Sequence, residues 1–149
     1  MTTTPKKMIE TCACNKVRTA ARLVTRAYDD ALRPTGLRAS QCAVLAAIAA
    51  QGHGNNSMSI TELAQAMSMD RSTLKRNVTP LETLGLLNVG AEGWRRSRLL
   101  TITDKGKAAL EAAVPLWEAS QKRLKKMLGA DGWSDVQSTL DNLIKTTRE

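Results

Sequence analysis

Two short helical patterns separated by a three-residue turn constrain the fold of this 149-residue chain more than any other feature. The first pattern begins with a capping-box sequence, Ser59 to Glu62, and ends near Ser68. The second begins after Asp70, and its apolar residues recur at helical spacing at Leu74, Val78, Leu81 and Leu84. This arrangement predicts a helix-turn-helix, although a helical hairpin with a solvated outer face fits the same pattern.

The start of the second helix carries small polar and basic side chains rich in hydrogen-bond donors: Arg71, Ser72, Thr73, Lys75, Arg76 and Asn77. In helix-turn-helix proteins that read DNA, residues at the start of the second helix contact base edges in the major groove. We therefore expect these six residues to contact DNA. Pro80 interrupts the same helix and removes one backbone hydrogen bond, so we expect a tolerated kink there.

A β-hairpin is predicted directly after the two helices. Leu86–Val89 and Leu99–Thr103 have the composition of strands, and a glycine-containing turn follows the first of them. Three arginines stand at or beside the hairpin tip, and they are Arg95, Arg96 and Arg98. Long guanidinium side chains there could reach phosphates or a narrow minor groove, although exposed hairpins also carry charge to resist aggregation.

The net charge of +8 is concentrated in two parts of the chain. Residues 11–38 and residues 71–98 each contain six basic and two acidic side chains, and the rest of the chain sums to zero. Such a local excess is typical of a surface that binds a polyanion, although a basic surface without a partner has the same composition. With three Trp, one Tyr and no Phe, platforms for stacking single-stranded bases are scarce, which favours double-stranded DNA.

Helical patterns also flank the central unit. A long helix is predicted over Ile9–Leu32, ended by Pro34 and Gly36, and a second helix runs from Ser40 to about Gly52 before a turn-forming loop over 52–57. After the hairpin, Asp104 caps a helical region over Lys105–Leu128, kinked at Pro115 and ended by Gly129. A final amphipathic helix carries Trp133, Val136, Leu140, Leu143 and Ile144.

The predicted fold is mainly α with a small β-hairpin wing, in one compact domain. Residues 1–38 would form an N-terminal dimerisation helix, residues 39–104 a winged helix-turn-helix, and residues 105–149 C-terminal dimerisation helices. The apolar stripes of the terminal helices are generous for one small domain, and a two-fold homodimer is the commonest way to cover such faces. Packing of these helices on their own chain remains the alternative.

The sequence resembles the MarR family of bacterial and archaeal transcriptional regulators over nearly its whole length. The resemblance rests on the order and spacing of several motifs, which are Arg33-Pro34-x-Gly36-Leu37 with Gln41 and Leu45, Ile60-Thr61-x-Leu63-Ala64, Asp70-Arg71-Ser72-Thr73-Leu74-x-Arg76, Leu81-Glu82-x-Leu84-Gly85-Leu86-Leu87, the wing arginines, and Leu100-Thr101-Ile102-Thr103-x-x-Gly106.

The resemblance implies a winged helix-turn-helix dimer on a pseudo-palindromic operator, usually a repressor released by a small ligand. Arg96 matches the wing arginine of the family. Trp94 stands where the family commonly has an acidic residue that orders the wing, so the reach of this wing is left open. By position in the family, Tyr28 and Trp117 would line the effector pocket.

Arg18 begins an arginine stripe with i, i+4 spacing that continues through Arg22 and Arg26. Pairing of this stripe with Asp29 and Asp30 on the same helix is favoured over binding of an anionic effector. Either an anionic or an aromatic small molecule therefore remains a candidate effector.

Cys12 and Cys14 allow a redox-sensing alternative, since some relatives in the family sense oxidants through a cysteine on the first helix. Helical positions two apart point in nearly opposite directions, which argues against a shared metal ion. Packing of Cys12, Cys14 and Cys42 as small apolar residues is favoured over both.

Other function classes find little support in the sequence. One histidine in a glycine-rich loop, with no phosphate-cradling motif, does not indicate an enzyme, and we expect no catalytic residue, cofactor or metal. Neither a membrane span nor a signal peptide is apparent, so we expect a cytoplasmic protein without a membrane partner. A nonspecific architectural nucleic-acid-binding protein remains the alternative to a sequence-specific regulator.

Overall fold

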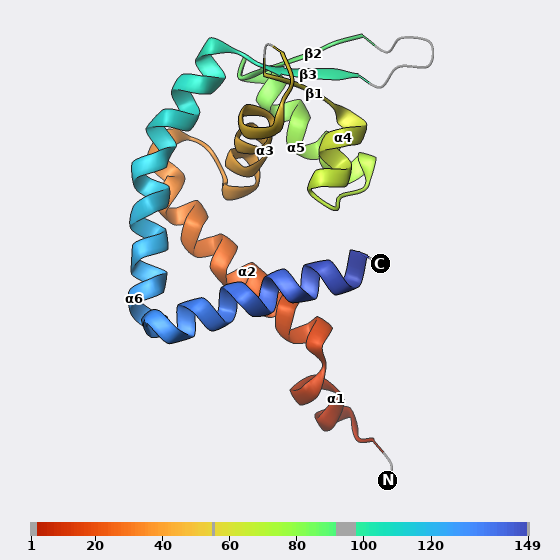
Figure 1. Ribbon diagram of the computed structural model, residues 1–149, viewed down its shortest axis with the longest axis vertical. Coiled ribbons are helices and arrows are strands. Elements are labelled where there is room, and N and C mark those ends of the chain that lie inside the picture. The colour runs from red at the N-terminus through yellow and green to blue at the C-terminus, as the bar shows by residue number, and fades with distance from the viewer. Residues whose placement is uncertain (1–2, 55, 92–97, 149) are drawn as a thin grey trace.

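In the computed structural model, which describes residues 3–54, 56–91 and 98–148, a small antiparallel sheet lies at one end of a mainly helical molecule (Figure 1). The element order confirms a mainly α fold with a β-hairpin wing. Its elements in chain order are α1 (Pro5–Thr11), α2 (Ala13–Leu32), a 3-10 turn (Arg33–Thr35), α3 (Ala39–Gln51), β1 (Ser57–Ser59), α4 (Ile60–Ala66), α5 (Arg71–Thr83), β2 (Leu87–Val89), β3 (Leu99–Ile102) and α6 (Asp104–Arg148).

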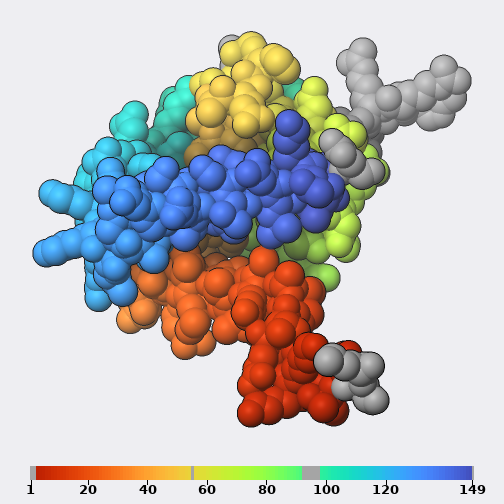
Figure 2. All heavy atoms as spheres, turned by 60° about the horizontal axis from the view of Figure 1, so that its bottom comes forward, coloured from red at the N-terminus to blue at the C-terminus, as the bar shows by residue number. Residues whose placement is uncertain are grey.

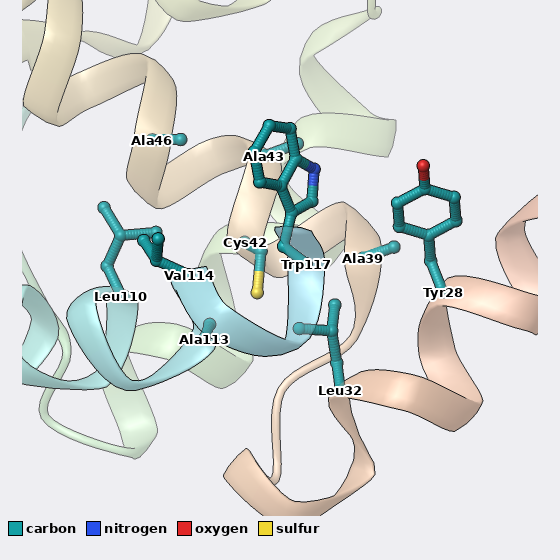
Figure 3. A pocket seen from close by; sticks show the side chains of 10 residues that line it. All are labelled: Tyr28, Leu32, Ala39, Cys42, Ala43, Ala46, Leu110, Ala113, Val114 and Trp117. Atoms are coloured by element: carbon teal, nitrogen blue, oxygen red, sulfur yellow. The ribbon is translucent and has the colours of Figure 1, made fainter. Parts of the chain in front are cut away.

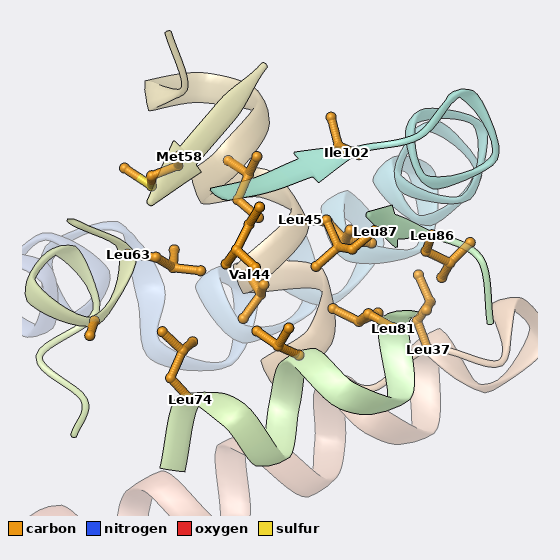
Figure 4. Close-up of a cluster of buried hydrophobic side chains, with 14 residues drawn as sticks. Leu37, Val44, Leu45, Met58, Leu63, Leu74, Leu81, Leu86, Leu87 and Ile102 are labelled. Atoms are coloured by element: carbon orange, nitrogen blue, oxygen red, sulfur yellow. The ribbon is translucent and has the colours of Figure 1, made fainter. Parts of the chain in front are cut away.

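One hydrophobic core holds α3, α4, α5 and the sheet together (Figure 4). Leu45 from α3, Leu63 from α4 and Leu74 from α5 are each fully buried in it. The other buried members are Leu37, Val44, Ile48, Met58, Ala64, Val78, Leu81, Leu86, Leu87, Leu100 and Ile102. Because Leu74, Val78 and Leu81 of α5 enter this core, the opposite face of α5 is left to solvent. Leu84, also expected to point inward, is the C-cap of α5 and is 46% exposed.

The sheet has the strand order β1-β3-β2, with both pairings antiparallel. The hairpin strands lie where the sequence predicts them, and their register pairs Leu87 with Ile102. The sequence predicted a turn-forming loop over 52–57 and gave no sign of β1. Ser57 of β1 pairs with Thr101 of β3, and their hydroxyl oxygens lie 2.7 Å apart. Three residues with two serines give no strand periodicity, so this strand is specified by its partner β3 rather than locally.

The N-terminal helix is broken at Cys12, where an unbroken helix over Ile9–Leu32 was expected. Cys12 has an extended backbone (φ −66°, ψ 113°) that separates α1 from α2. Thr4 caps α1, which has no buried residue and projects away from the rest of the chain (Figures 1 and 2). Gly36 ends the 3-10 turn after α2 with φ 72°, a left-handed conformation that suits glycine.

Helix α6 consists of two arms joined at Gly129, which has φ 75° and ψ 165°. We call residues 104–128 the first arm and residues 130–148 the second arm. The non-helical backbone lies at Gly129, whereas the kink was expected at Pro115. Pro115 is exposed, so water can hydrogen-bond to the backbone carbonyl that lacks a partner because proline has no N–H.

The second arm crosses α2 and ends beside the turn after α4 (Figures 1 and 2). There the Arg148 guanidinium donates to the Ser68 hydroxyl at 3.0 Å and to the Ala66 carbonyl at 3.1 Å. In the described ranges, no helix is both long and apolar enough to span a membrane.

Candidate nucleic-acid interface and neighbouring pocket

The turn between α4 and α5 fixes the orientation of α5 relative to α4. Ser68 adopts φ 51°, and the backbone N–H of Met69 donates to the Ala64 carbonyl at 2.9 Å. This left-handed residue reverses the chain within the short connection that the sequence predicts between the two helices. The result is a helix-turn-helix in which the N-terminus of α5 faces outward.

Side-chain caps hold the first turn of each of these helices. Asp70 accepts from the backbone N–H of Thr73 at 2.7 Å and from the Ser72 hydroxyl at 2.8 Å. At α4, the predicted capping box forms between Ser59 and Glu62, with contacts of 2.9 and 3.1 Å. The hydrogen bonds from Thr73 and Ser72 lower the pKa of Asp70, and those from Ser59 lower the pKa of Glu62.

The outward face of α5 is a polar stripe made by Arg71, Ser72, Lys75, Arg76 and Thr79, all of which are exposed. Thr79 was not among the residues expected from the sequence, although it follows Ser72 and Lys75 at helical spacing on the same face. A stripe of donors and positive charge along one short helix is what major-groove contacts require.

Several of the expected DNA-contacting residues already make hydrogen bonds within the protein. Thr73 and Asn77 are half-buried, and the Asn77 side-chain amide donates to the Thr73 carbonyl at 3.1 Å. Arg71 is exposed, but its guanidinium donates to the Thr61 hydroxyl at 2.7 Å and so ties α5 to α4. Lys75 and Arg76 are therefore the exposed basic side chains best placed to reach a ligand from the middle of the stripe.

The wing is described only at its base. Arg95, Arg96 and Trp94 lie outside the described residues, so their expected roles remain predictions. Arg98 is half-buried beside the sheet, and its carbonyl accepts from the backbone N–H of Ile60 at 2.8 Å. Arg98 therefore joins the wing to the start of α4.

A cavity of about 390 Å³ lies behind the helix-turn-helix, between α2, α3 and the first arm of α6 (Figure 3). Tyr28 and Trp117, the two aromatic residues expected to contact an effector, both line it. Its other lining residues are Leu32, Ala39, Cys42, Ala43, Ala46, Leu110, Ala113 and Val114. The contribution of α3 was not expected from the sequence, although the alanines of this helix leave space between neighbouring helices.

Few polar groups face this cavity. The Tyr28 hydroxyl donates to the side-chain carbonyl of Gln121, and burial raises the pKa of Tyr28. Burial and then the Asp29 carboxylate raise the pKa of the Cys42 thiol. Both groups therefore remain neutral near pH 7.

The arginine stripe of α2 lies apart from the cavity. Arg18 is exposed and is not among the residues that line it. The acidic partners expected for the stripe are engaged elsewhere, since Asp30 pairs with Arg33 and Asp29 accepts from the backbone N–H of Ala39 at 2.7 Å. The predicted pairing of the stripe with these two carboxylates was therefore wrong.

The cysteines are free, and they differ in environment. Cys12 and Cys14 are exposed, so the expectation that they pack as small apolar residues was wrong; Cys42 is half-buried in the cavity wall. No group of three or more His, Cys, Asp or Glu side chains suited to a metal ion occurs among residues 3–54, 56–91 and 98–148.

No protein-family model matches this sequence, and a search of curated proteins gives no match. Solved structures do match. The transcriptional regulator MosR of M. tuberculosis is 35% identical, with a TM-score of 0.79, over 94% of this chain and 98% of that chain. A structure of MosR in complex with DNA is 36% identical, with a TM-score of 0.79, over 92% of this chain and 96% of that chain.

More distant regulators share the fold. BpsR of Bordetella bronchiseptica, whose DNA binding is regulated by 6-hydroxynicotinic acid, is 23% identical with a TM-score of 0.76 over 90% of this chain and 94% of that chain. AbsC of Streptomyces coelicolor, a MarR family transcriptional regulator, is 21% identical with a TM-score of 0.76 over 99% and 98%. These similar proteins are regulators and not enzymes.

Proposed function

This chain belongs to the MarR family of DNA-binding transcriptional regulators, and we propose that it is a homodimeric, cytoplasmic repressor that releases its operator when a small ligand occupies the cavity behind α3. In this proposal each protomer inserts α5 into the major groove of one half-site. The proposed protein acts by binding DNA and a ligand, and not by catalysis.

The exposed stripe on α5 is the observation that carries this proposal. Its inward positions Leu74, Val78 and Leu81 are buried, so the helix is firmly seated while its opposite face presents donors. Because the core holds the backbone of α5 in place, Lys75 and Arg76 are positioned with little loss of backbone conformational entropy on binding. We assign base contacts to this stripe, with Thr73 and Asn77 beside it, and phosphate contacts to the wing arginines Arg95, Arg96 and Arg98.

A homodimer is supported by apolar side chains left uncovered on α2 and on the second arm of α6. Leu23 is 57% exposed, and Leu140 and Ile144 are 43% and 48% exposed. A two-fold axis through such surfaces would set two half-sites about 10 to 10.5 base pairs apart. An inverted repeat is therefore the expected operator.

Ligand control is supported by the position of α3. One face of α3 lines the cavity at Cys42, Ala43 and Ala46, while Val44 and Leu45 enter the core that seats α5. A ligand that displaces α3 would therefore shift α5 of one protomer relative to α5 of the other protomer. The distance between the two reading helices would then no longer match the operator.

Small-ligand control takes precedence over the redox alternative in this proposal. BpsR, which shares the fold, is regulated by a small organic acid. Cys12 precedes α2 and Cys14 lies in its first turn, whereas Tyr28, the first cavity-lining residue in the chain, lies near the other end of this helix. Oxidation of these cysteines would therefore not act directly on the cavity.

The test is selection of bound duplexes from a random pool by the purified protein at stated salt concentrations. Enrichment of an inverted repeat with half-sites one helical turn apart would support the proposal. Equal affinity for all duplexes would instead indicate a nonspecific nucleic-acid-binding protein, and binding at one unrepeated site would contradict the dimer.

A further inference from the structure

We infer that the cavity between α2, α3 and α6 accepts a neutral, flat aromatic molecule and discriminates against anions. The regulatory meaning of this inference rests on the function proposed above. The binding preference itself can be measured without DNA.

The lining of the cavity is the first argument. None of its lining side chains is charged, and α3 contributes only alanines and Cys42. Tyr28 from α2 and Trp117 from α6 supply two aromatic rings (Figure 3). A surface of this kind favours flat apolar molecules, whereas a buried charge without a partner costs free energy.

The N-terminus of α3 is the second argument. A helix N-terminus usually attracts anions, and that of α3 adjoins the cavity at Ala39. Here the Asp29 carboxylate already accepts the Ala39 N–H at 2.7 Å, so this donor is occupied and a negative charge lies beside the first residue of α3. After burial, the same carboxylate also contributes to the raised pKa of Cys42, which lies in the cavity wall.

A polar group of the lining is already used by the protein. The Tyr28 hydroxyl of α2 donates its hydrogen bond to the Gln121 side chain of α6, so this hydrogen is not available to a ligand carboxylate. A volume of about 390 Å³ is at the lower end of the range for small-molecule sites, roughly 300–1,000 Å³, and suits a molecule of the size of naphthalene.

The experiment is calorimetric titration of the full-length protein at pH 7 with three compounds of matched shape. They are 2-naphthalenemethanol, which is neutral, 2-naphthoate, an anion, and 2-naphthylmethylammonium, a cation. We expect the neutral compound to bind with a Kd at least about tenfold lower than that of either ion. An anion that binds as tightly as the neutral compound, or a cation that binds more tightly, would overturn the inference.

Two variants tie the preference to this cavity. Asp29→Asn keeps an oxygen acceptor for the Ala39 N–H but removes the charge, so the disadvantage of 2-naphthoate should shrink while binding of the neutral compound stays unchanged. Ala43→Phe should fill the cavity and abolish binding of the neutral compound, whereas Ala49→Phe, an exposed α3 position outside the lining, should not. Unchanged discrimination in Asp29→Asn would remove the role of this carboxylate.

The two proposals fail in different ways. If the wild-type chain selects an operator but binds none of the three compounds, the pocket inference is wrong and the DNA-binding function stands. If it binds the neutral compound but selects no operator, the ligand preference stands and the proposed function is wrong.

Discussion

The central body and the terminal helices of this chain bury their apolar residues to very different extents. The body, residues 37–102, contains a single cluster of fully or nearly fully buried side chains from α3, α4, α5 and the sheet. By contrast, α1 has no buried residue and α2 has only Leu32. In α6 only Gly106 and Ala113, both in the first arm, are buried.

This difference indicates that contacts within the chain stabilise the body, whereas the terminal helices leave apolar side chains for a partner protomer to cover. Burial of apolar area is the main favourable contribution to folding, so the body has its own source of stability. The terminal helices instead keep large apolar residues at the surface: Met8, Ile9, Val17, Leu23, Val24, Val136, Leu140, Leu143 and Ile144. Many large apolar residues exposed on a few helices are typical of an oligomer interface.

The largest expected effect comes from a charge placed on that apolar surface. Leu140→Asp should convert the dimer into monomers, because a carboxylate would be buried without a partner. Operator affinity should fall by about 10²–10⁴-fold, since the two half-site contacts would no longer be linked. Sedimentation equilibrium and fluorescence anisotropy with the selected operator measure the two effects.

Asn142→Asp is the matched control for Leu140→Asp. It adds the same charge to the same arm, two residues further along and on a different side of the helix. It should remain dimeric and bind the operator normally. If Leu140→Asp behaved in the same way, the second arm would not belong to the dimer interface.

A second pair of variants compares the two regions directly within the Leu140→Asp monomer. Leu45→Ala, at a fully buried position of α3, should lower the free energy of unfolding by about 2–5 kcal/mol. Leu23→Ala, at a 57% exposed position of α2, should change it by less than about 0.5 kcal/mol. Urea denaturation measures both, and equal effects would show that the body is not independently stable.

The same contrast explains which elements the sequence could predict. Helices α4 and α5 and the wing strands carry local signals, such as the Asp70 cap and the inward spacing of Leu74, Val78 and Leu81. The strand β1 carries none, because Ser57 and Ser59 gain strand geometry only by pairing with β3. The break at Cys12 also has no local marker, since neither glycine nor proline stands there.

The cavity was still less accessible to sequence reasoning. Its walls come from three helices far apart in the sequence, so no spacing rule brings Tyr28, Cys42 and Trp117 together. Tyr28 and Trp117 were named through family resemblance, whereas Arg18 was named for its charge and lies outside the lining. The alanines of α3 indicated an apolar helix but not the space that they leave open.

A third test separates two neighbouring residues of the reading helix. Arg76 is exposed, whereas Asn77 is half-buried and donates to the Thr73 carbonyl. Arg76→Ala should weaken operator binding by about 1–3 kcal/mol through a lost base or phosphate contact, and Asn77→Ala should weaken it less. Neither should alter the dimer, so anisotropy should change without a change in sedimentation. A larger effect of Asn77→Ala would mean that this side chain leaves its bond to Thr73 on binding DNA.

The smallest effect concerns the cap of α5. Hydrogen bonds to Thr73 and Ser72 lower the pKa of Asp70 in the folded protein, so the ionised cap stabilises α5 above the unfolded-state pKa of about 4. This contribution should be lost as the pH falls through the lower folded-state value. Asp70→Asn should retain the acceptor for Thr73 and remove this pH dependence, whereas Asp70→Ala should lower the melting temperature at every pH. Thermal unfolding between pH 7 and pH 3 measures these differences. Identical pH profiles for wild type and Asp70→Asn would mean that acid acts on another carboxylate, with Glu62 at the cap of α4 the first to examine because its pKa is lowered in the same way.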